Sequence, residues 1–169
     1  MSAHAHRDKH DAHGKLIVRL RDLASDAARL TDGLGEADLS RRVMEGKWSL
    51  KELLCHLWRL QQVFEGRIDA MLATENPPVA SYSPDGDAEF DKMAAAPGAE
   101  VRDGFLRDRE RFAERLEQLG PADWHRPGRH PDFPRYDVHF QVEYMAHHEA
   151  HHTYQMFQRR SLIDVKVPH

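Results

Sequence analysis

The sequence predicts an all-α protein: an up-down-down-up type four-helix bundle with a long crossover between helices two and three. Four long segments carry apolar residues at three- and four-residue steps, the period of a helix with one buried face. No segment shows the strict alternation of polar and apolar residues that is typical of a strand. With 169 residues the chain can bury one sizeable core, so we expect a single bundle.

The first bundle helix is expected to begin at Lys15, where the apolar periodicity starts, and to end before Gly33 and Gly35. Residues 1–14 contain four histidines and precede that periodicity. We interpret them as a flexible, histidine-rich N-terminal tail and place the bundle domain at residues 15–169. A mobile tail makes a poor specific metal site, because nothing around it orients the ligands.

The second helix should run from about Ser49 to Ala73, since Ser49 and Glu52 have the spacing of a capping box. The stretch after it is rich in Pro, Gly and Ser, which indicates a long crossover with a short helix near residues 89–95.

The third helix carries an apolar stripe over residues 99–119, and the fourth should start near residue 136 and end near residue 161. The charges of "RDRERFAERLEQ" in the third helix are interpreted as a solvated face with ion pairs.

Composition excludes several classes of protein. The formal net charge of −4 provides no global positive field for nonspecific nucleic-acid binding. No stretch approaches the roughly 18 apolar residues of a membrane span. Cys55 is the only cysteine, and the N-terminus lacks the apolar segment of a secretory signal. We therefore expect a cytoplasmic protein with neither nucleic acid nor membrane as a partner.

The histidines of the last helix suggest a metal site. In "EYMAHHEAHHTYQMFQRR" four histidines fall within six residues. At about 100° per residue, His148 and His152 lie beside the apolar stripe, while His147 and His151 turn toward its margin. A separation of four residues on one helical face lets two imidazoles converge on one ion.

Two histidines leave a metal ion undercoordinated, because catalytic sites of the zinc type usually take three protein ligands and keep one position open. The candidate third ligand is His56, at the flank of the inward stripe of the second helix. Without such a partner site, His56 would be interpreted as a structural histidine with a hydrogen-bond acceptor. The neighbouring Cys55 points about 100° away and is interpreted as a small core residue.

These motifs resemble the DinB-like superfamily of metal-binding four-helix bundles, which includes the bacillithiol and mycothiol S-transferases. In that family a Trp-Ser/Thr pair opens helix two, a histidine follows on the same helix, and a late helix carries a His-x-x-x-His pair. The matching residues here are the pair Trp48-Ser49, then His56, and His148 with His152. The resemblance covers the chain from Lys15 to Arg160 and selects the same three histidines as the helical wheel.

The family often continues the histidine pair as Arg-Gly-Gln, whereas this chain has Thr153, Tyr154 and Gln155. The departure at the first two positions concerns the surrounding pocket more than the metal ligands.

The resemblance implies a metal-dependent enzyme, a thiol S-transferase or a hydrolase that acts on small electrophiles. The cofactor would be a divalent metal ion, Zn or Ni in the first place and otherwise Fe, Co or Mn; three imidazoles suit zinc, nickel, cobalt and iron(II) alike and do not identify the ion. The implied partners are a small-molecule substrate, a low-molecular-weight thiol and a second copy in a homodimer. Glu149 is the candidate proton acceptor, although an interhelix salt bridge would also account for its position.

The alternative is a non-enzymatic metal-binding bundle in which the ion is structural or sensed. An open coordination position that faces a cleft would favour the enzyme, whereas closure by His147, His151 or Cys55 would favour a structural ion. A heme or di-iron bundle is a weaker third hypothesis, because di-iron sites need Glu-x-x-His motifs on paired helices.

Overall fold

The computed structural model describes residues 2–164, with side chains from residue 12 onward, and within this range it contains helices and no strand. The four long helices are α1 (Ser2–Arg29), α3 (Leu50–Ala73), α5 (Gly98–Glu117) and α7 (Val138–Asp164). Three short helices, α2 (Glu36–Ser40), α4 (Ala88–Ala95) and α6 (Pro121–Trp124), lie in the connections. The predicted all-α four-helix bundle is therefore confirmed.

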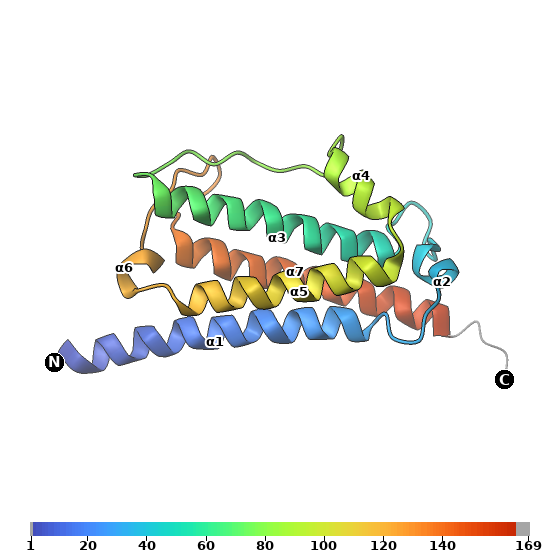
Figure 1. Cartoon of the computed structure of the whole chain (residues 1–169), viewed down its shortest axis with the longest axis horizontal. Coiled ribbons are helices and arrows are strands. Elements are labelled where there is room, and N and C mark those ends of the chain that lie inside the picture. The colour runs from blue at the N-terminus through green and yellow to red at the C-terminus, as the bar shows by residue number, and fades with distance from the viewer. Residues whose placement is uncertain (1, 165–169) are drawn as a thin grey trace.

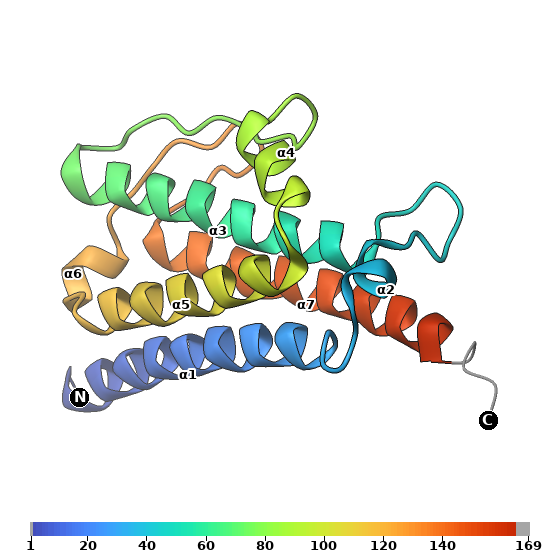
Figure 2. The same ribbon diagram turned by 45° about the vertical axis from the view of Figure 1, so that its right-hand side comes forward.

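The four long helices form a bundle in which α1 and α3 lie diagonally opposite each other (Figures 1 and 2). Helix α1 packs on α5 and α7, and α3 packs on the same two helices. The chain runs in one direction along α1 and α7 and in the opposite direction along α3 and α5 (Figure 1). As a result α3 and α7 are antiparallel neighbours, so the beginning of α3 lies beside the later half of α7.

Two apolar clusters fill the interior, one at each end of the bundle. The first contains Phe64, Phe112 and Trp124, and the second contains Leu53, Phe105 and Met156. The chain's three- and four-residue apolar period supplies both clusters, because each long helix turns one stripe inward. Tight packing of the second cluster also needs Gly104 on α5: a Cβ there would overlap the ring of Trp58.

The start of α3 agrees with the prediction in detail. The side chain of Ser49 accepts a hydrogen bond from the backbone N–H of Glu52, and the Glu52 carboxylate accepts one from the backbone N–H of Ser49. This capping box satisfies backbone donors that the first turn leaves without partners. It also places His56 two turns inside a well-anchored helix.

The crossover between α3 and α5 runs over one side of α3 (Figure 1). Its first part is tied to the loop between α6 and α7, since the Val79 N–H donates to the carbonyl of Arg129 and the Arg129 N–H donates to the carbonyl of Pro77, over 2.9 and 2.8 Å. Further along, Asp87 accepts hydrogen bonds from Arg59 at 2.7 Å and from Tyr82 at 2.8 Å. Two connections distant in sequence thus cover the same side of α3.

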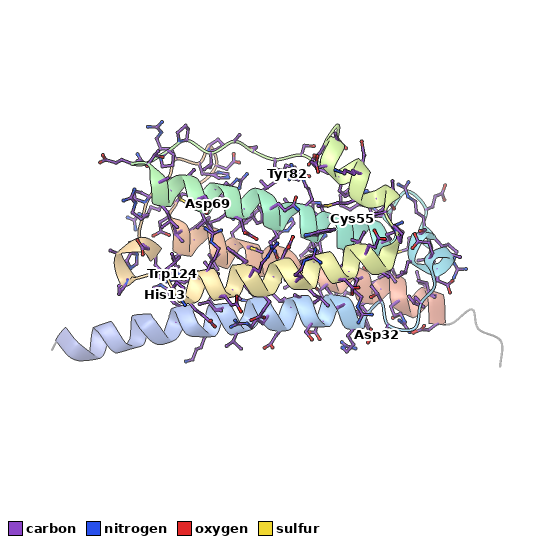
Figure 3. All side chains as sticks on the ribbon, viewed as in Figure 1. His13, Asp32, Cys55, Asp69, Tyr82 and Trp124 are labelled. Atoms are coloured by element: carbon purple, nitrogen blue, oxygen red, sulfur yellow. The ribbon has the colours of Figure 1, made fainter. Side chains whose placement is uncertain are left out.

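The N-terminal segment differs from the sequence prediction. Helix α1 begins at Ser2 and continues through Gly14 without a break, whereas regular structure was expected only from Lys15. The ring of His13 stacks on Trp124 of α6, with 4.2 Å between centroids, and both residues are labelled in Figure 3. This tertiary contact outweighs the roughly 1 kcal/mol by which a glycine weakens a helix interior. The division into a tail and a domain at residue 15 stays a prediction.

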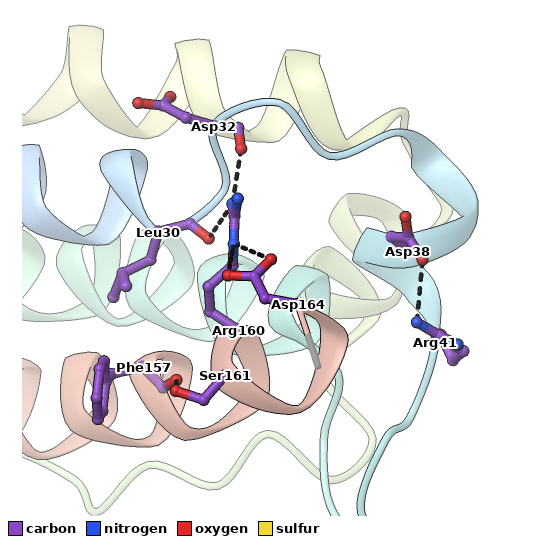
Figure 4. A network of polar contacts seen from close by, with 8 residues as sticks. All are labelled: Leu30, Asp32, Asp38, Arg41, Phe157, Arg160, Ser161 and Asp164. Carbon is purple, nitrogen blue, oxygen red and sulfur yellow. Dashed lines mark hydrogen bonds and ion pairs between the residues drawn. The ribbon is translucent and has the colours of Figure 1, made fainter. Parts of the chain in front are cut away.

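The ends of α1 and α7 are joined by Arg160. Its guanidinium donates to the backbone carbonyls of Leu30 at 3.3 Å and of Asp32 at 2.6 Å, and to the Asp164 carboxylate at 3.0 Å (Figure 4). The carbonyls at and just beyond the end of a helix have no partner within the helix, so the arginine satisfies groups that would otherwise need water.

A buried arginine connects all four long helices. Arg109 on α5 is 1% exposed and donates to Gln61 of α3 at 2.7 Å and to the carbonyl of Leu20 of α1 at 2.6 Å. It also pairs with both carboxylate oxygens of Glu149 on α7, one of them at 2.9 Å. The interpretation of this part of α5 as a wholly solvated face was wrong for Arg109. For Glu149, the structure contains the interhelix ion pair that the sequence left as an alternative.

We expect Glu149→Ala to lower the free energy of unfolding by about 3–5 kcal/mol, because it leaves the Arg109 charge buried without its partner. Urea denaturation of the variant and the wild type measures this difference. The matched control is Glu143→Ala, which removes a half-exposed carboxylate of the same helix and should cost less than about 1 kcal/mol. Equal effects of the two substitutions would contradict a stabilising role of the buried pair.

Candidate metal centre

Three histidines from two helices meet where α3 and α7 cross. His56 lies on α3, and His148 and His152 lie one turn apart on α7. One ring nitrogen from each residue lies within 4.8 Å of the others, and among the described residues no other group of three metal-ligating side chains meets this condition. The antiparallel packing of α3 on α7 thus brings together the three residues that the sequence singled out.

The distances suit one small ion. The Nε2 atoms of His148 and His152 are 3.1 Å apart. Two imidazole ligands on a tetrahedral zinc ion, each with a bond of about 2.0–2.1 Å, place their nitrogens roughly 3.3 Å apart. The ring of His56 stands edge-on to that of His152, with 4.6 Å between centroids. The donor set, three imidazoles and no carboxylate, fits Zn, Ni, Co or Fe(II).

Burial keeps the three imidazoles in the form that binds metal. Burial, together with the smaller effect of the nearby histidines, lowers the pKa of His56 to about 3 and that of His148 to about 4. The pKa of His152 is also below its usual value, again mainly because of burial. At neutral pH all three rings are therefore uncharged, and a neutral imidazole has the lone pair that a metal ion needs.

Gln155 orients one of the rings. Its Oε1 lies 2.8 Å from Nδ1 of His152, and its Nε2 lies 3.2 Å from Nε2 of His151. An oxygen acceptor at Nδ1 places the proton of His152 there, so Nε2 directs its lone pair toward the other two rings. Gln155 also matches the glutamine of the family motif, and the structure gives that position a physical role.

Of the three ring nitrogens that are buried without a hydrogen-bond partner in the described part of the chain, two belong to metal-ligand candidates: Nδ1 of His56 and Nδ1 of His148, the third being Nδ1 of His139 elsewhere in the bundle. An unpaired polar group in a buried position costs free energy. Aromatic rings surround these imidazoles, with Trp48 4.8 Å from His56 and Tyr144 stacked 5.9 Å from His148 between centroids. Three close imidazoles in such apolar surroundings are the arrangement that a bound cation would stabilise.

The three residues that could have closed the site lie elsewhere. His147 is 64% exposed and faces Glu143, and His151 faces Gln155. Cys55 is fully buried in the second apolar cluster, where burial raises the pKa of its thiol to about 12. Among the described residues, none of these three joins the group formed by His56, His148 and His152.

One side of the site opens into a cleft of about 230 Å³. It is bounded by α3, by the crossover after α3, by the loop before α7 and by α7 itself. His56 and His148 form its inner end, and the remaining lining residues are Leu60, Phe64, Arg67, Ser81, Tyr82, Pro84, His130, Asp132, Phe133 and Tyr144. Larger depressions occur on other faces, such as the one between α1 and α5 near Ala24, but within the described residues no cluster of three metal-ligating side chains adjoins that one. The volume of the cleft is below the roughly 300–1,000 Å³ of pockets for drug-sized ligands, so the cleft is limited to a smaller molecule.

Two other predicted positions are placed by the structure outside the cleft. The carboxylate of Glu149 is engaged by Arg109 in the interior of the bundle. Tyr154, where the chain departs from the family motif, is 60% exposed and does not line the cleft. Thr153, the other departing residue, is likewise absent from the lining of the cleft.

Sequence reasoning missed the polar residues of the cleft. Arg67 follows His56 by eleven residues, three turns of helix, so both lie on the same face of α3. The eleven-residue spacing could therefore have identified Arg67 as a residue near His56. His130 and Tyr82 lie in connections without helical periodicity, so no sequence pattern places them beside the histidines.

Comparisons with known proteins agree with this geometry. The sequence model of the DinB superfamily matches residues 19–156. A search of curated proteins gives no significant match. Among solved structures, YfiT from Bacillus subtilis, described as a probable metal-dependent hydrolase with an unusual four-helix bundle topology, is similar with a TM-score of 0.76 and 17% identity. The similarity covers 87% of this chain and 85% of that one.

Two structures of the mycothiol-dependent maleylpyruvate isomerase, one of them a mutant, are similar with a TM-score of 0.70 and 12% identity. They are matched over 85% of this chain and 60% of theirs, so this chain spans somewhat less than two thirds of the isomerase. At these identities the structures support the fold, and the family match extends over most of the sequence. The chain belongs to the DinB superfamily.

Proposed function

We propose that this protein is a metal-dependent enzyme, a thiol S-transferase or a hydrolase of small electrophiles, with His56, His148 and His152 as ligands of one divalent ion. The observation that carries the proposal is the geometry of the three imidazoles. They converge beside a cleft that His56 and His148 line, and among the described residues no fourth side chain joins them. Such an arrangement leaves a coordination position for a substrate, which is typical of catalytic sites.

Each residue around the site has a definite part in the proposal. The buried imidazoles stay neutral and bind the ion, and Gln155 holds His152 in the tautomer that directs Nε2 inward. Trp48 and Tyr144 flank the imidazoles and limit the access of water. When bound, a divalent ion supplies a Lewis acid that lowers the pKa of a thiol or a water molecule into the neutral range.

The two structural neighbours support the two versions of the reaction. One is named as dependent on mycothiol, which favours a low-molecular-weight thiol as cosubstrate. The other is described as a probable metal-dependent hydrolase, which favours water as the nucleophile. Zinc and nickel are the proposed ions, because both accept three imidazole ligands.

The second candidate is a non-enzymatic bundle in which the ion holds α3 against α7. Direct contact of ligands from both helices favours this role, since the ion would crosslink them. The cleft onto which the site opens favours the enzyme instead, because a purely structural ion usually has four protein ligands and no access for substrate.

We expect about one divalent ion per chain in protein purified without an affinity tag. His56→Ala, His148→Ala and His152→Ala should each abolish stoichiometric retention after dialysis, because two imidazoles hold an ion weakly. Elemental analysis measures the ion. Two controls should retain it: His147→Ala on the exposed face of α7, and a variant with alanine at His4, His6 and His10. An ion that remains in all three site variants, or leaves with the N-terminal histidines, would refute the proposed site.

We expect Gln155→Leu to weaken metal affinity by about 10- to 100-fold, because residues that orient a ligand typically contribute this much. Competition with a chelating indicator measures the affinity. Gln158→Leu is the matched control, since Gln158 lies one turn further along α7 and its amide oxygen accepts from Arg159, not from a ring of the site. The same affinity in both variants would show that Gln155 does not hold the ligand.

We expect the metal-free protein to lose stability as the pH falls from about 6.5 toward 4. The pKa values of the three histidines are lowered in the folded state, so over this range the unfolded chain binds more protons than the folded protein. Urea midpoints at several pH values measure the slope. His56→Leu should make the slope shallower, whereas His147→Leu, on the exposed face of α7, should leave it unchanged. Equal slopes in the wild type and His56→Leu would contradict this explanation.

A further inference from the structure

The outer part of the cleft contains a cation that the proposed chemistry does not use. Arg67 lines the cleft on the same face of α3 as His56. Side chains of an α-helix lean toward its N-terminus, which for Arg67 is the direction of His56. Its guanidinium carbon lies 5.3 Å from the centre of the Phe64 ring, and that ring stands edge-on to His148 with 6.4 Å between centroids. One aromatic ring therefore separates the guanidinium from the metal ligands.

The guanidinium is positioned but not neutralised. It donates to the carbonyl of Ala80 at 2.6 Å and to Oε1 of Gln141 at 3.3 Å. Among the described residues no carboxylate lies within 4.0 Å of it, whereas Arg59 on the same helix is paired with Asp87. The Tyr136 hydroxyl is a third neighbour within hydrogen-bonding reach of the guanidinium, and these contacts do not use all five of its N–H donors. Arg67 thus keeps N–H donors and a full charge for a group that enters the cleft.

The other titratable groups of the cleft leave this charge in place. Burial lowers the pKa of His130, and the charge of Arg67 lowers it further, so His130 is neutral near pH 7. Asp132 is at the rim, where its side chain is 71% exposed and faces His130. Tyr82 is turned toward Asp87 and donates its hydroxyl proton there. The interior of the cleft therefore combines aromatic walls with one positive charge.

We propose that the cleft binds a small carboxylate-bearing substrate, with Arg67 holding the carboxylate and the reacting part of the molecule lying against His56 and His148. Arginine presents N–H groups in a planar fork that matches a carboxylate, and the pair is stronger where aromatic side chains exclude water. The walls formed by Phe64, Phe133 and Tyr144 suit an apolar or unsaturated body between the two ends. This inference rests on the proposed function, because it assigns the substrate class of that site.

The test compares benzoate with benzamide, which has nearly the same shape and no charge. Binding of each is measured by NMR titration to the full-length protein, both metal-free and metal-loaded. In the wild type we expect benzoate to bind at least about tenfold more tightly than benzamide, the ratio expected for a charge-assisted pair. Arg67→Gln should abolish this preference in both forms of the protein, and Arg67→Lys should retain part of it.

Arg107→Gln is the matched control. It removes the same charge from an arginine of α5 that is 63% exposed and does not line the cleft, so the preference for benzoate should remain. The inference is overturned if the wild type does not prefer benzoate, or if the preference survives in Arg67→Gln, since the carboxylate would then bind elsewhere, including at the ion. Loss of the preference in Arg107→Gln would also overturn it.

The result of the carboxylate-binding test can be distinguished from the result of the metal-retention test of the proposed function. Arg67 is not a proposed metal ligand, so loss of carboxylate selectivity with retention of the ion leaves the three-histidine site intact. Failure of the protein to retain any ion, with the carboxylate preference present in the metal-free form, would reject the metal-dependent reaction and keep the carboxylate subsite.

Discussion

The guanidinium of Arg109 on α5 donates hydrogen bonds to acceptors on each of the other three long helices, α1, α3 and α7. Its partners lie beside the candidate metal centre. Gln61 follows His56 on α3 by five residues, and Glu149 lies between His148 and His152 on α7. A sliding movement of α3 along α7 would break these charged hydrogen bonds in a nonpolar environment, where a lost partner is costly. The buried pair therefore fixes the relative position of the helices that carry the three histidines.

Much of this arrangement was predictable because it follows from local periodicity. The capping box at Ser49 and the apolar stripes fix the helices, and the four-residue spacing of His148 and His152 places both rings on one face. The sequence also contains an indication of the buried ion pair. Arg109 falls in the apolar stripe of α5, four residues after Phe105, which is an unusual position for a solvated charge. Glu149 likewise falls on the buried face of α7.

Other features depend on contacts between residues far apart in the chain, and no local pattern encodes these. The helical conformation before Lys15 is supported by the stacking of His13 on Trp124, more than a hundred residues later. The cleft also depends on such contacts. The crossover and the loop before α7 together form one of its sides, and backbone hydrogen bonds of Val79 and Arg129 join them. Proline-rich connections are recognisable as irregular, but their sequences do not reveal what they cover.

The distribution of charge explains why a site of this composition suits an anionic nucleophile. Three neutral imidazoles contribute no negative charge, so an ion held by His56, His148 and His152 would keep its full positive charge toward the cleft. The nearest buried carboxylate, Glu149, does not offset that charge, because Arg109 engages both of its oxygens. A thiolate or hydroxide would then be stabilised by the ion, and Asp132, the carboxylate among the lining residues of the cleft, is mostly exposed and faces His130. The same buried pair that aligns the helices thus also engages the buried carboxylate that could otherwise have weakened the electrostatic effect of the centre.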